Sequence, residues 1–138
     1  MNKKFKTMTF ADVMTRPVVC ASPDTSAHEI SEKLSSNSFS GMPIVENKTV
    51  IGIVSQRDIL QLFIQGKNLK STLAQEFMTT NVITANQDSL VFSGIKAFVD
   101  NQILRLPITN NGKLVGIITR QDLLKVICDT TPEFALIS

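Results

Sequence analysis

The sequence predicts an α+β fold built from two repeats of the order βαββα, and two observations carry this prediction. The stretch at residues 52–58 (GIVSQRD) recurs 64 residues later at residues 116–122 (GIITRQD), and residues 12–63 align with residues 76–127 without a gap. A fixed internal period of this kind indicates a duplicated structural unit. In each copy, an apolar run passes through a hydroxyl residue into an amphipathic pattern, which is typical of a strand followed directly by a helix.

Composition and charge narrow the classes of protein to which the chain can belong. A hydrophobic content of 43% over 138 residues is enough to fill a core. A net charge of +2 is too small for a surface that neutralises many phosphates of a nucleic acid. No apolar run approaches the roughly 18 residues of a membrane span, and residues 1–10 lack the apolar centre of a secretory signal. We therefore expect no nucleic-acid partner, no membrane partner and a cytoplasmic location.

The duplication also divides the chain. We expect an N-terminal arm, a first repeat, a polar connector, a second repeat and a C-terminal arm, with bounds at residues 1–10, 11–65, 66–74, 75–128 and 129–138. The arm carries Phe5, Met8 and Phe10, which are apolar enough to pack against the fold. The connector is too short for the repeats to behave as independent domains, so both repeats form one structural module.

Within the first repeat, each predicted element has a local cause. Pro17 ends a helical turn and favours an extended chain before it, and residues 22–25 (SPDT) supply a turn and a helix cap. The predicted helical turn, strand, helix, two hairpin strands and final helix lie at residues 11–15, 18–20, 26–37, 42–45, 50–54 and 56–65. The second repeat follows the same order, and its Asn111-Gly112 pair is favoured in tight hairpin turns.

The helices carry more apolar residues than one small sheet can cover. Residues 56–65 include Ile59, Leu60, Leu62, Phe63 and Ile64, and the helices of the second repeat show a similar excess. The repeats should therefore pack against each other and against a second chain, which predicts a homodimer. By contrast, His28 has no ligand-spaced neighbour, and the two cysteines have neither a C-x-x-C spacing nor an adjacent histidine, so no metal site is predicted.

The recurring motif has two interpretations, and its spacing fits both. Ser55 and Asp58, like Thr119 and Asp122, place an acid three residues after a hydroxyl, which resembles a capping box that only starts a helix. Alternatively, the helix N-terminus, the hydroxyl and a nearby arginine receive a phosphate. The aspartate, which carries only acceptors, would then hold the two hydroxyls of a ribose. We call these residues the hydroxyl-x-x-Asp motif.

Three signatures occur in the same order in both repeats. They are VMTRPV and FMTTNV near the start, MPIV and LPIT midway, and GIVSQRD and GIITRQD near the end. With these signatures the chain resembles a tandem pair of CBS domains, also called a Bateman module. The resemblance covers residues 10–128. It implies that the repeats pack about a pseudo-two-fold axis through their sheets and that two chains form a flat disc of four repeats.

The resemblance also implies a function and a set of site residues. Similar proteins hold an adenine nucleotide or another adenosyl compound in clefts between the repeats, so AMP, ADP or ATP is expected as a regulator rather than a catalytic cofactor. Each cleft takes its motif from one repeat and the opening strand and mid-repeat turn from the other. The first cleft would use Thr15, Val18, Cys20, Ser40, Gly41, Met42, Thr119, Arg120 and Asp122. The second would use Ser55, Arg57, Asp58, Thr79, Val82, Thr84, Arg105 and Leu106.

The two predicted clefts differ from each other. Gly41 corresponds to Arg105, so the first cleft offers room and the second an extra cation. Asn81 stands where the first repeat has Pro17, which departs from the usual opening signature. Arg57 and Arg120 occupy different positions in the motif, so at most one of them points at phosphate in the manner of the family.

A second function remains open beside the regulatory one. The chain could be a dimerisation or interaction scaffold whose clefts are vestigial and hold no ligand. No enzyme is expected, because the sequence shows no paired carboxylates, no nucleophile with an adjacent base and no metal cluster. Since these 138 residues contain no fused effector domain, we expect a separate effector protein to read the bound state.

Overall fold

The structure is a computed structural model that describes residues 3–130. These residues form two compact units. Residues 19–82 make up one, here called the central unit. Residues 3–18 and 83–130 make up the other, here called the split unit because two distant stretches of chain build it. Each unit combines helices with a small sheet, so the predicted α+β class is confirmed.

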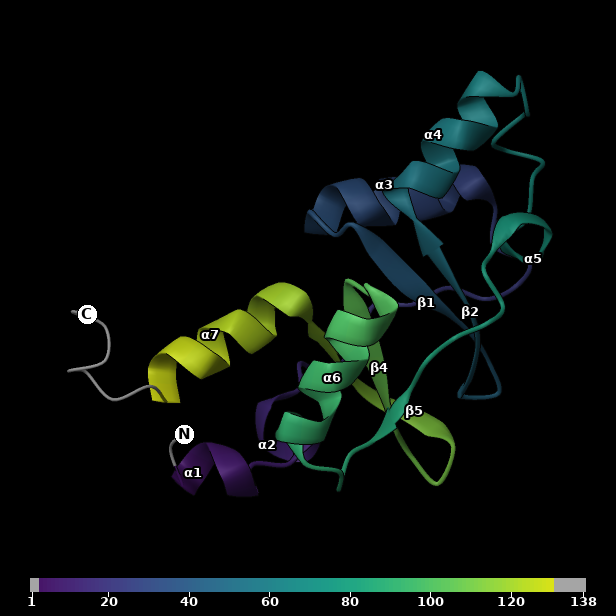
Figure 1. Cartoon of the computed structure of the whole chain (residues 1–138). Helices are drawn as coiled ribbons and strands as arrows, with labels where there is room; N and C mark the ends of the chain where they lie inside the picture. The colour runs from purple at the N-terminus through teal and green to yellow at the C-terminus, as the bar shows by residue number, and fades with distance from the viewer. Residues whose placement is uncertain (1–2, 131–138) are drawn as a thin grey trace. The chain divides into compact units, whose positions relative to one another are not determined.

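The central unit packs helices against a hairpin (Figure 1). Its elements are α3 (Ala27–Asn37), β1 (Gly41–Glu46), β2 (Thr49–Ser55), α4 (Gln56–Ile64) and α5 (Ala74–Phe77). Strands β1 and β2 pair antiparallel, and α3 packs against α4. A single parallel bridge joins Ala21 to Ile44, and an antiparallel bridge joins Thr79 to Ile53.

The split unit repeats this arrangement with residues from both ends of the chain. Its elements are α1 (Lys3–Thr7), α2 (Phe10–Val13), β3 (Ala85–Asn86), α6 (Val91–Asn101), β4 (Arg105–Asn110), β5 (Lys113–Thr119) and α7 (Arg120–Thr130). The sheet has the order β3-β4-β5, with β3 parallel to β4 and β4 antiparallel to β5. Helix α1 packs against both α6 and α7.

The predicted opening strand at residues 18–20 is not a strand. Val18, Val19 and Cys20 have no ladder, and pairing with β1 starts only at Ala21. There, the Ala21 N–H donates to Pro43 O at 3.1 Å, and the Val45 N–H donates to Ala21 O at 2.8 Å. The apolar run at residues 18–20 correctly indicated the segment that approaches the sheet. The chain turns at Ser22, so this segment forms only one bridge, at Ala21.

Both hairpin turns use left-handed backbone, and the second is the tight turn that the Asn-Gly pair predicted. Asn111 and Gly112 have φ of 52° and 79°, and Asn47 and Lys48 have φ of 52° and 65°. Positive φ at both central residues matches the right-handed twist of the strands on each side. The first repeat therefore places a lysine in the conformation where the second has glycine.

The N-terminal arm is part of a core rather than a loose extension. Phe5 is 4% exposed and Phe10 is 1% exposed, and both lie in the core cluster of the split unit with Val91, Phe98 and Leu123. The prediction that the aromatic residues of the arm pack is thus confirmed. Their partners belong to the second repeat, which the order of residues along the chain did not reveal.

The connector between the repeats is also hydrogen-bonded to the fold. Carbonyl oxygens of Thr72 and Leu69 accept from the N–H groups of Ala27 and His28 at 2.8 and 3.0 Å. These are two of the amides that the first turn of α3 cannot satisfy itself. Ala74, which follows, is fully buried in the core of the central unit. The stretch predicted as a polar connector therefore caps a helix of the repeat that precedes it.

Candidate functional site

Both hydroxyl-x-x-Asp motifs form complete capping boxes. At the start of α4, the Asp58 N–H donates to Ser55 Oγ at 3.2 Å, and the Ser55 N–H donates to Asp58 Oδ2 at 2.8 Å. At the start of α7, the corresponding distances between Asp122 and Thr119 are both 3.0 Å. The structural interpretation of the motif is therefore correct in both repeats.

The capping boxes leave acceptor capacity on the aspartates of both motifs. Each box engages Oδ2 of its aspartate, and a carboxylate has two oxygens with acceptor capacity beyond one hydrogen bond. The four side chains are only half-buried. A helix-starting role is thus compatible with a role in binding hydroxyl groups.

The helix N-termini have few spare amides. The N–H of Gln56 donates to Ser40 O at 2.9 Å, and that of Arg120 donates to Leu104 O at 2.8 Å. Among residues 3–130, the second helical residues, Arg57 and Gln121, have amides that engage no backbone or side-chain acceptor. An anion at either helix would meet one free amide, the motif hydroxyl and the exposed arginine at that helix start.

The opening segment of each repeat is hydrogen-bonded to the strand before the other repeat's motif. In the split unit, Thr15 and Ile117 exchange two backbone bonds, of 2.8 and 3.1 Å. In the central unit, Thr79 and Ile53 exchange two bonds of 2.9 Å. The structure thereby brings Thr15 into the same unit as the motif of the second repeat, and Thr79 into the same unit as the motif of the first.

A methionine side chain packs at each place where an opening segment meets the strand before the other repeat's motif. The Met78 side chain covers Gly52, where an added Cβ would lie 2.5 Å from the sulfur, and Met14 covers Gly116 in the same way. A β-carbon at either position would force the methionine side chain to shift, so the glycines permit the close approach. Sequence analysis did not assign this role, although the methionine and the glycine recur at the same offset and so signalled a shared contact.

Of the other predicted cleft residues, Val18 and Val82 lie in the same unit as their motif, and the rest fall into the opposite unit. Cys20, Ser40, Gly41 and Met42 of the first cleft lie in the central unit, whereas Thr84, Arg105 and Leu106 of the second lie in the split unit. Within its own unit, Gly41 pairs with Ser55, and Arg105 pairs with Thr119. Each unit therefore holds one motif, one opening segment and one mid-repeat turn.

Two of these residues have side chains packed inside a unit. Met42 and Leu106 are fully buried, each in the core of its own unit. The resemblance placed Met42 along the base, and that placement stays a prediction. The carbonyl of Cys20, another predicted contact, accepts from Lys33 Nζ at 3.3 Å. The sequence did not signal the Lys33 contact, because the two residues lie in different elements.

Arg105 differs from the two motif arginines. It is half-buried at the start of β4, and desolvation lowers the pKa of its guanidinium from the ordinary value of an arginine. A guanidinium remains protonated in proteins, so the group is a fixed, partly desolvated cation. Arg57 and Arg120 are exposed, and neither forms an ion pair within the described part of the chain.

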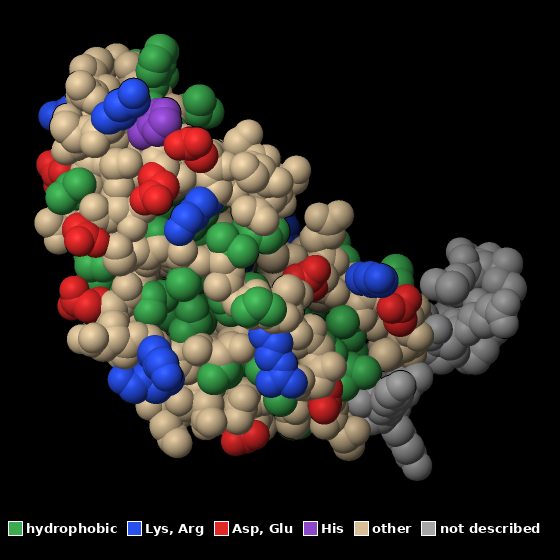
Figure 2. Space-filling view, turned by 180° about the vertical axis from the view of Figure 1, so that it is seen from behind, with side chains coloured by type: hydrophobic (Ala, Val, Ile, Leu, Met, Phe, Trp, Pro, Cys, Tyr) green, Lys and Arg blue, Asp and Glu red, His purple; other side chains and the backbone are tan. Residues whose placement is uncertain are grey.

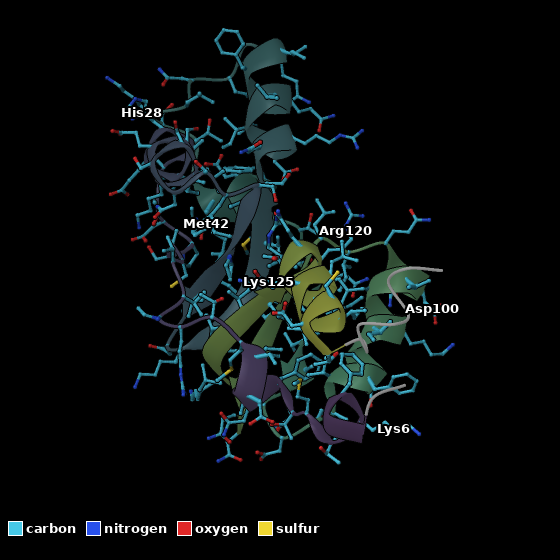
Figure 3. The ribbon with its side chains drawn as sticks, turned by 90° about the vertical axis from the view of Figure 1, so that its left-hand side faces the viewer. Lys6, His28, Met42, Asp100, Arg120 and Lys125 are labelled. Carbon is cyan, nitrogen blue, oxygen red and sulfur yellow. The ribbon has the colours of Figure 1, made fainter. Side chains whose placement is uncertain are left out.

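The structure gives no sign of a metal site. Residues 3–130 contain no group of three or more His, Cys, Asp or Glu side chains that could hold an ion. His28 lies on the outer side of α3 (Figure 3), where its Nδ1 is 3.1 Å from Glu32 Oε1. No described helix is long and apolar enough to cross a membrane.

The family model for the CBS domain matches residues 10–65 and 74–129, and the chain therefore belongs to the CBS-domain family. An uncharacterized protein of Methanopyrus kandleri is 38% identical over 88% of this chain and 63% of its own length. The inosine-5′-monophosphate dehydrogenase of Methanocaldococcus jannaschii is 31% identical over 83% of this chain but only 22% of its own length. The chain thus spans less than two thirds of these relatives.

Two solved structures share the fold of this chain, which is that of a CBS domain pair. The CBS domain pair of protein MJ0100, in complex with 5′-methylthioadenosine and S-adenosyl-L-methionine, has a TM-score of 0.80 at 25% identity. The match covers 90% of this chain and 98% of that one. Protein MJ1225 from Methanocaldococcus jannaschii has a TM-score of 0.78 at 26% identity, over 88% of this chain and 48% of that one. The predicted pair of CBS repeats is confirmed.

Proposed function

We propose that the chain is a regulatory module that binds an adenine nucleotide or another adenosyl compound in clefts between the repeats, and that a partner protein reads the bound state. The observation that carries this proposal is the duplicated placement of the motif. Each unit sets a hydroxyl, an aspartate and an arginine at a helix start beside the opening segment of the other repeat. The adenosyl ligands of the MJ0100 domain pair support the ligand class.

Each group has a distinct role in this proposal. The free carboxylate oxygen of Asp58 or Asp122 accepts from ribose hydroxyls while Oδ2 keeps the capping bond. The hydroxyl of Ser55 or Thr119, the free amide of the helix and the adjacent arginine face phosphate. Backbone groups near Val18 and Val82 read the edge of the base.

The two clefts would prefer different charges. The second includes Arg105, whose cation favours a phosphate-bearing ligand. The first has Gly41 at the equivalent position and accepts a bulkier or less charged group. A ligand shifts the module only by the difference in its affinity for two conformational states. Catalysis is not proposed, and the chain is expected to self-associate as a homodimer.

A thermal-shift titration with AMP, ADP, ATP and S-adenosyl-L-methionine tests the proposal. At least one ligand is expected to raise the melting temperature of the parent chain. Replacing Asp58 and Asp122 by asparagine keeps an acceptor for the capping bond but removes the charge and one acceptor. The double variant is expected to need at least 10-fold more ligand for the same shift, about 1.4 kcal/mol of binding energy.

Asp24→Asn with Asp88→Asn is the matched control, since these aspartates are also related by the repeat but lie outside both clefts. The control is expected to respond like the parent. If no ligand raises the melting temperature of the parent, the proposed regulatory function is contradicted. The chain would then be the scaffold, a function favoured by the exposed apolar residues of α4.

A further inference from the structure

The N-terminal helix α1 docks on the split unit through the ring of Phe5. Phe5 is 4% exposed and shares a core cluster with Phe98 of α6 and Leu123 of α7, and α1 packs against both of these helices. The next residue, Lys6, is exposed and points away from the fold (Figure 3). Figure 2 shows other hydrophobic side chains reaching the surface among charged ones. Burial of Phe5 is therefore not a general property of the apolar residues in this chain.

The internal repeat shows which segment α1 corresponds to. At the offset of 64 residues, α1 aligns with residues 67–71 of the connector, and Phe5 aligns with Leu69. The next aligned pair, Met8 and Thr72, has the same backbone role in both units. Their carbonyl oxygens accept from the first amides of α6 and α3, at 2.9 and 2.8 Å. The arm therefore occupies in the split unit the place that the connector occupies in the central unit.

The two segments differ in how they are attached. The connector follows α4 directly along the chain, and the Lys67 N–H donates to Leu62 O of that helix at 3.1 Å. Helices α1 and α7 lie at opposite ends of the sequence, so only packing and hydrogen bonds keep α1 beside α7. A helix of five residues is not stable by itself in water. Docking of α1 therefore depends on the burial of Phe5.

The helix against which α1 packs carries the second hydroxyl-x-x-Asp motif. Helix α7 begins with the capping box of Thr119 and Asp122, and Leu123 follows directly and is 5% exposed. Because Asp122 and Leu123 are adjacent in the first turn, a contact that holds the backbone at Leu123 also holds the carboxylate of Asp122. The equivalent residue of α4, Ile59, lies in a core cluster to which Phe5 does not belong.

We propose that Phe5 is a positioning residue for the second motif. By docking on α6 and α7, it holds the first turn of α7, and with it Asp122, in the geometry that receives ribose hydroxyls. The motif of Ser55 and Asp58 does not depend on the arm. Release of α1 then lowers ligand affinity at one motif and leaves the other unchanged. The effect on ligand rests on the proposed function, whereas the bracing of α7 does not.

Amide hydrogen exchange of the ligand-free chain, followed residue by residue by NMR, tests the bracing. Phe5→Ala is expected to speed exchange at residues 122–126 by about 10-fold, while residues 58–62 stay within about 2-fold of the parent. Phe5→Leu supplies the side chain found at the equivalent position of the connector and is expected to restore most of the protection. Lys6→Ala, at the exposed neighbour, is the matched control and is expected to exchange like the parent. Circular dichroism checks that every variant is folded.

Ligand affinity is then measured at one motif at a time. Asp58→Asn leaves only the second motif intact, and Asp122→Asn leaves only the first. Calorimetric titration with AMP and with S-adenosyl-L-methionine is expected to show that Phe5→Ala weakens binding about 5-fold in the Asp58→Asn chain, and not in the Asp122→Asn chain. A general loss of stability would weaken both chains alike, so the selectivity distinguishes positioning from a purely structural role.

Two results would overturn the inference. If Phe5→Ala leaves exchange at residues 122–126 unchanged, α1 does not brace α7. If Phe5→Ala weakens binding equally in both single-motif chains, Phe5 acts on the stability of the whole chain. A parent that binds neither ligand contradicts the proposed function instead, and the exchange rates by themselves then decide whether the arm braces α7.

Discussion

At the starts of α4 and α7, a hydroxyl and an aspartate bond to each other's backbone amides, and these four side chains are also the proposed ligand groups. The capping bonds hold Asp58 and Asp122 in fixed rotamers before any ligand arrives. Pre-ordering of this kind lowers the entropy lost on binding. The two interpretations that the sequence left open are therefore compatible with one geometry, and asparagine rather than alanine is the informative substitution.

The two hairpin turns allow a residue-scale test of stability. Lys48 has φ of 65°, and its counterpart Gly112 has φ of 79°. A side chain costs free energy in this region, whereas glycine does not. Lys48→Gly is expected to raise the free energy of unfolding by about 0.5–1 kcal/mol, measured by urea denaturation.

The reciprocal substitution is the control for this test. Gly112→Lys is expected to lower the free energy of unfolding by a similar amount, with nothing within 4 Å to complicate the result sterically. If Lys48→Gly were destabilising, the left-handed turn would not be the source of strain.

At the scale of elements, the two units differ at the contact between the short helix, α2 or α5, and the first long helix, α6 or α3. One unit pairs a large residue of the short helix with a small residue of the long helix, and the other has the sizes reversed. In the split unit, the Phe10 ring lies against Gly94 of α6. The equivalent residues of the central unit are Ala74 and Ile30, both fully buried. The volume at this crossing is conserved between the units even though neither residue is.

This packing predicts strong coupling between Phe10 and Gly94. Gly94→Ala places a Cβ 2.9 Å from Phe10 Cε1, closer than real contacts allow, and should cost about 1–3 kcal/mol. Phe10→Ala leaves a cavity in the core and should cost about 3–5 kcal/mol.

Because Phe10→Ala makes room for the new methyl group, the double variant should cost less than the sum of the single variants. Urea denaturation of the four proteins gives the coupling energy. Strict additivity would mean that the arm does not pack on α6. Gly66→Ala is a poor control, because Gly66 has φ of 75° and strains any side chain. Ser93→Ala, at an exposed position of the same helix, is suitable.

At the scale of the whole molecule, the sequence predicted what depends on local pattern. The gapless alignment predicted the repeats, and the Asn-Gly pair predicted a tight hairpin turn. The hydroxyl-x-x-Asp spacing predicted the helix starts at Ser55 and Thr119. The turn and the helix starts follow from residues a few positions apart, whose geometry is fixed by the backbone.

Apart from the resemblance, the sequence did not predict that the opening segment of each repeat packs in the same unit as the other repeat's motif. Residues 3–18 span the N-terminal arm and the opening of the first repeat, yet they lie in the same unit as the second motif, and Thr15 bonds to Ile117 across about a hundred residues of sequence. Hydrophobicity shows that Phe5 and Phe10 are buried, but not by what. Likewise, the burial of Met42 and Leu106 in their own cores depends on which face of the strand each occupies, and a one-residue error in strand position reverses that face.

The central claim is that this chain holds an adenosyl ligand, and native mass spectrometry tests it most directly. The parent chain is titrated with AMP, ATP, 5′-methylthioadenosine and S-adenosyl-L-methionine, together with the Asp58→Asn, Asp122→Asn variant. The account predicts adducts of one or two ligands per chain that the variant loses. Spectra that show only the bare chain at every ligand concentration, or equal adducts in parent and variant, would contradict it.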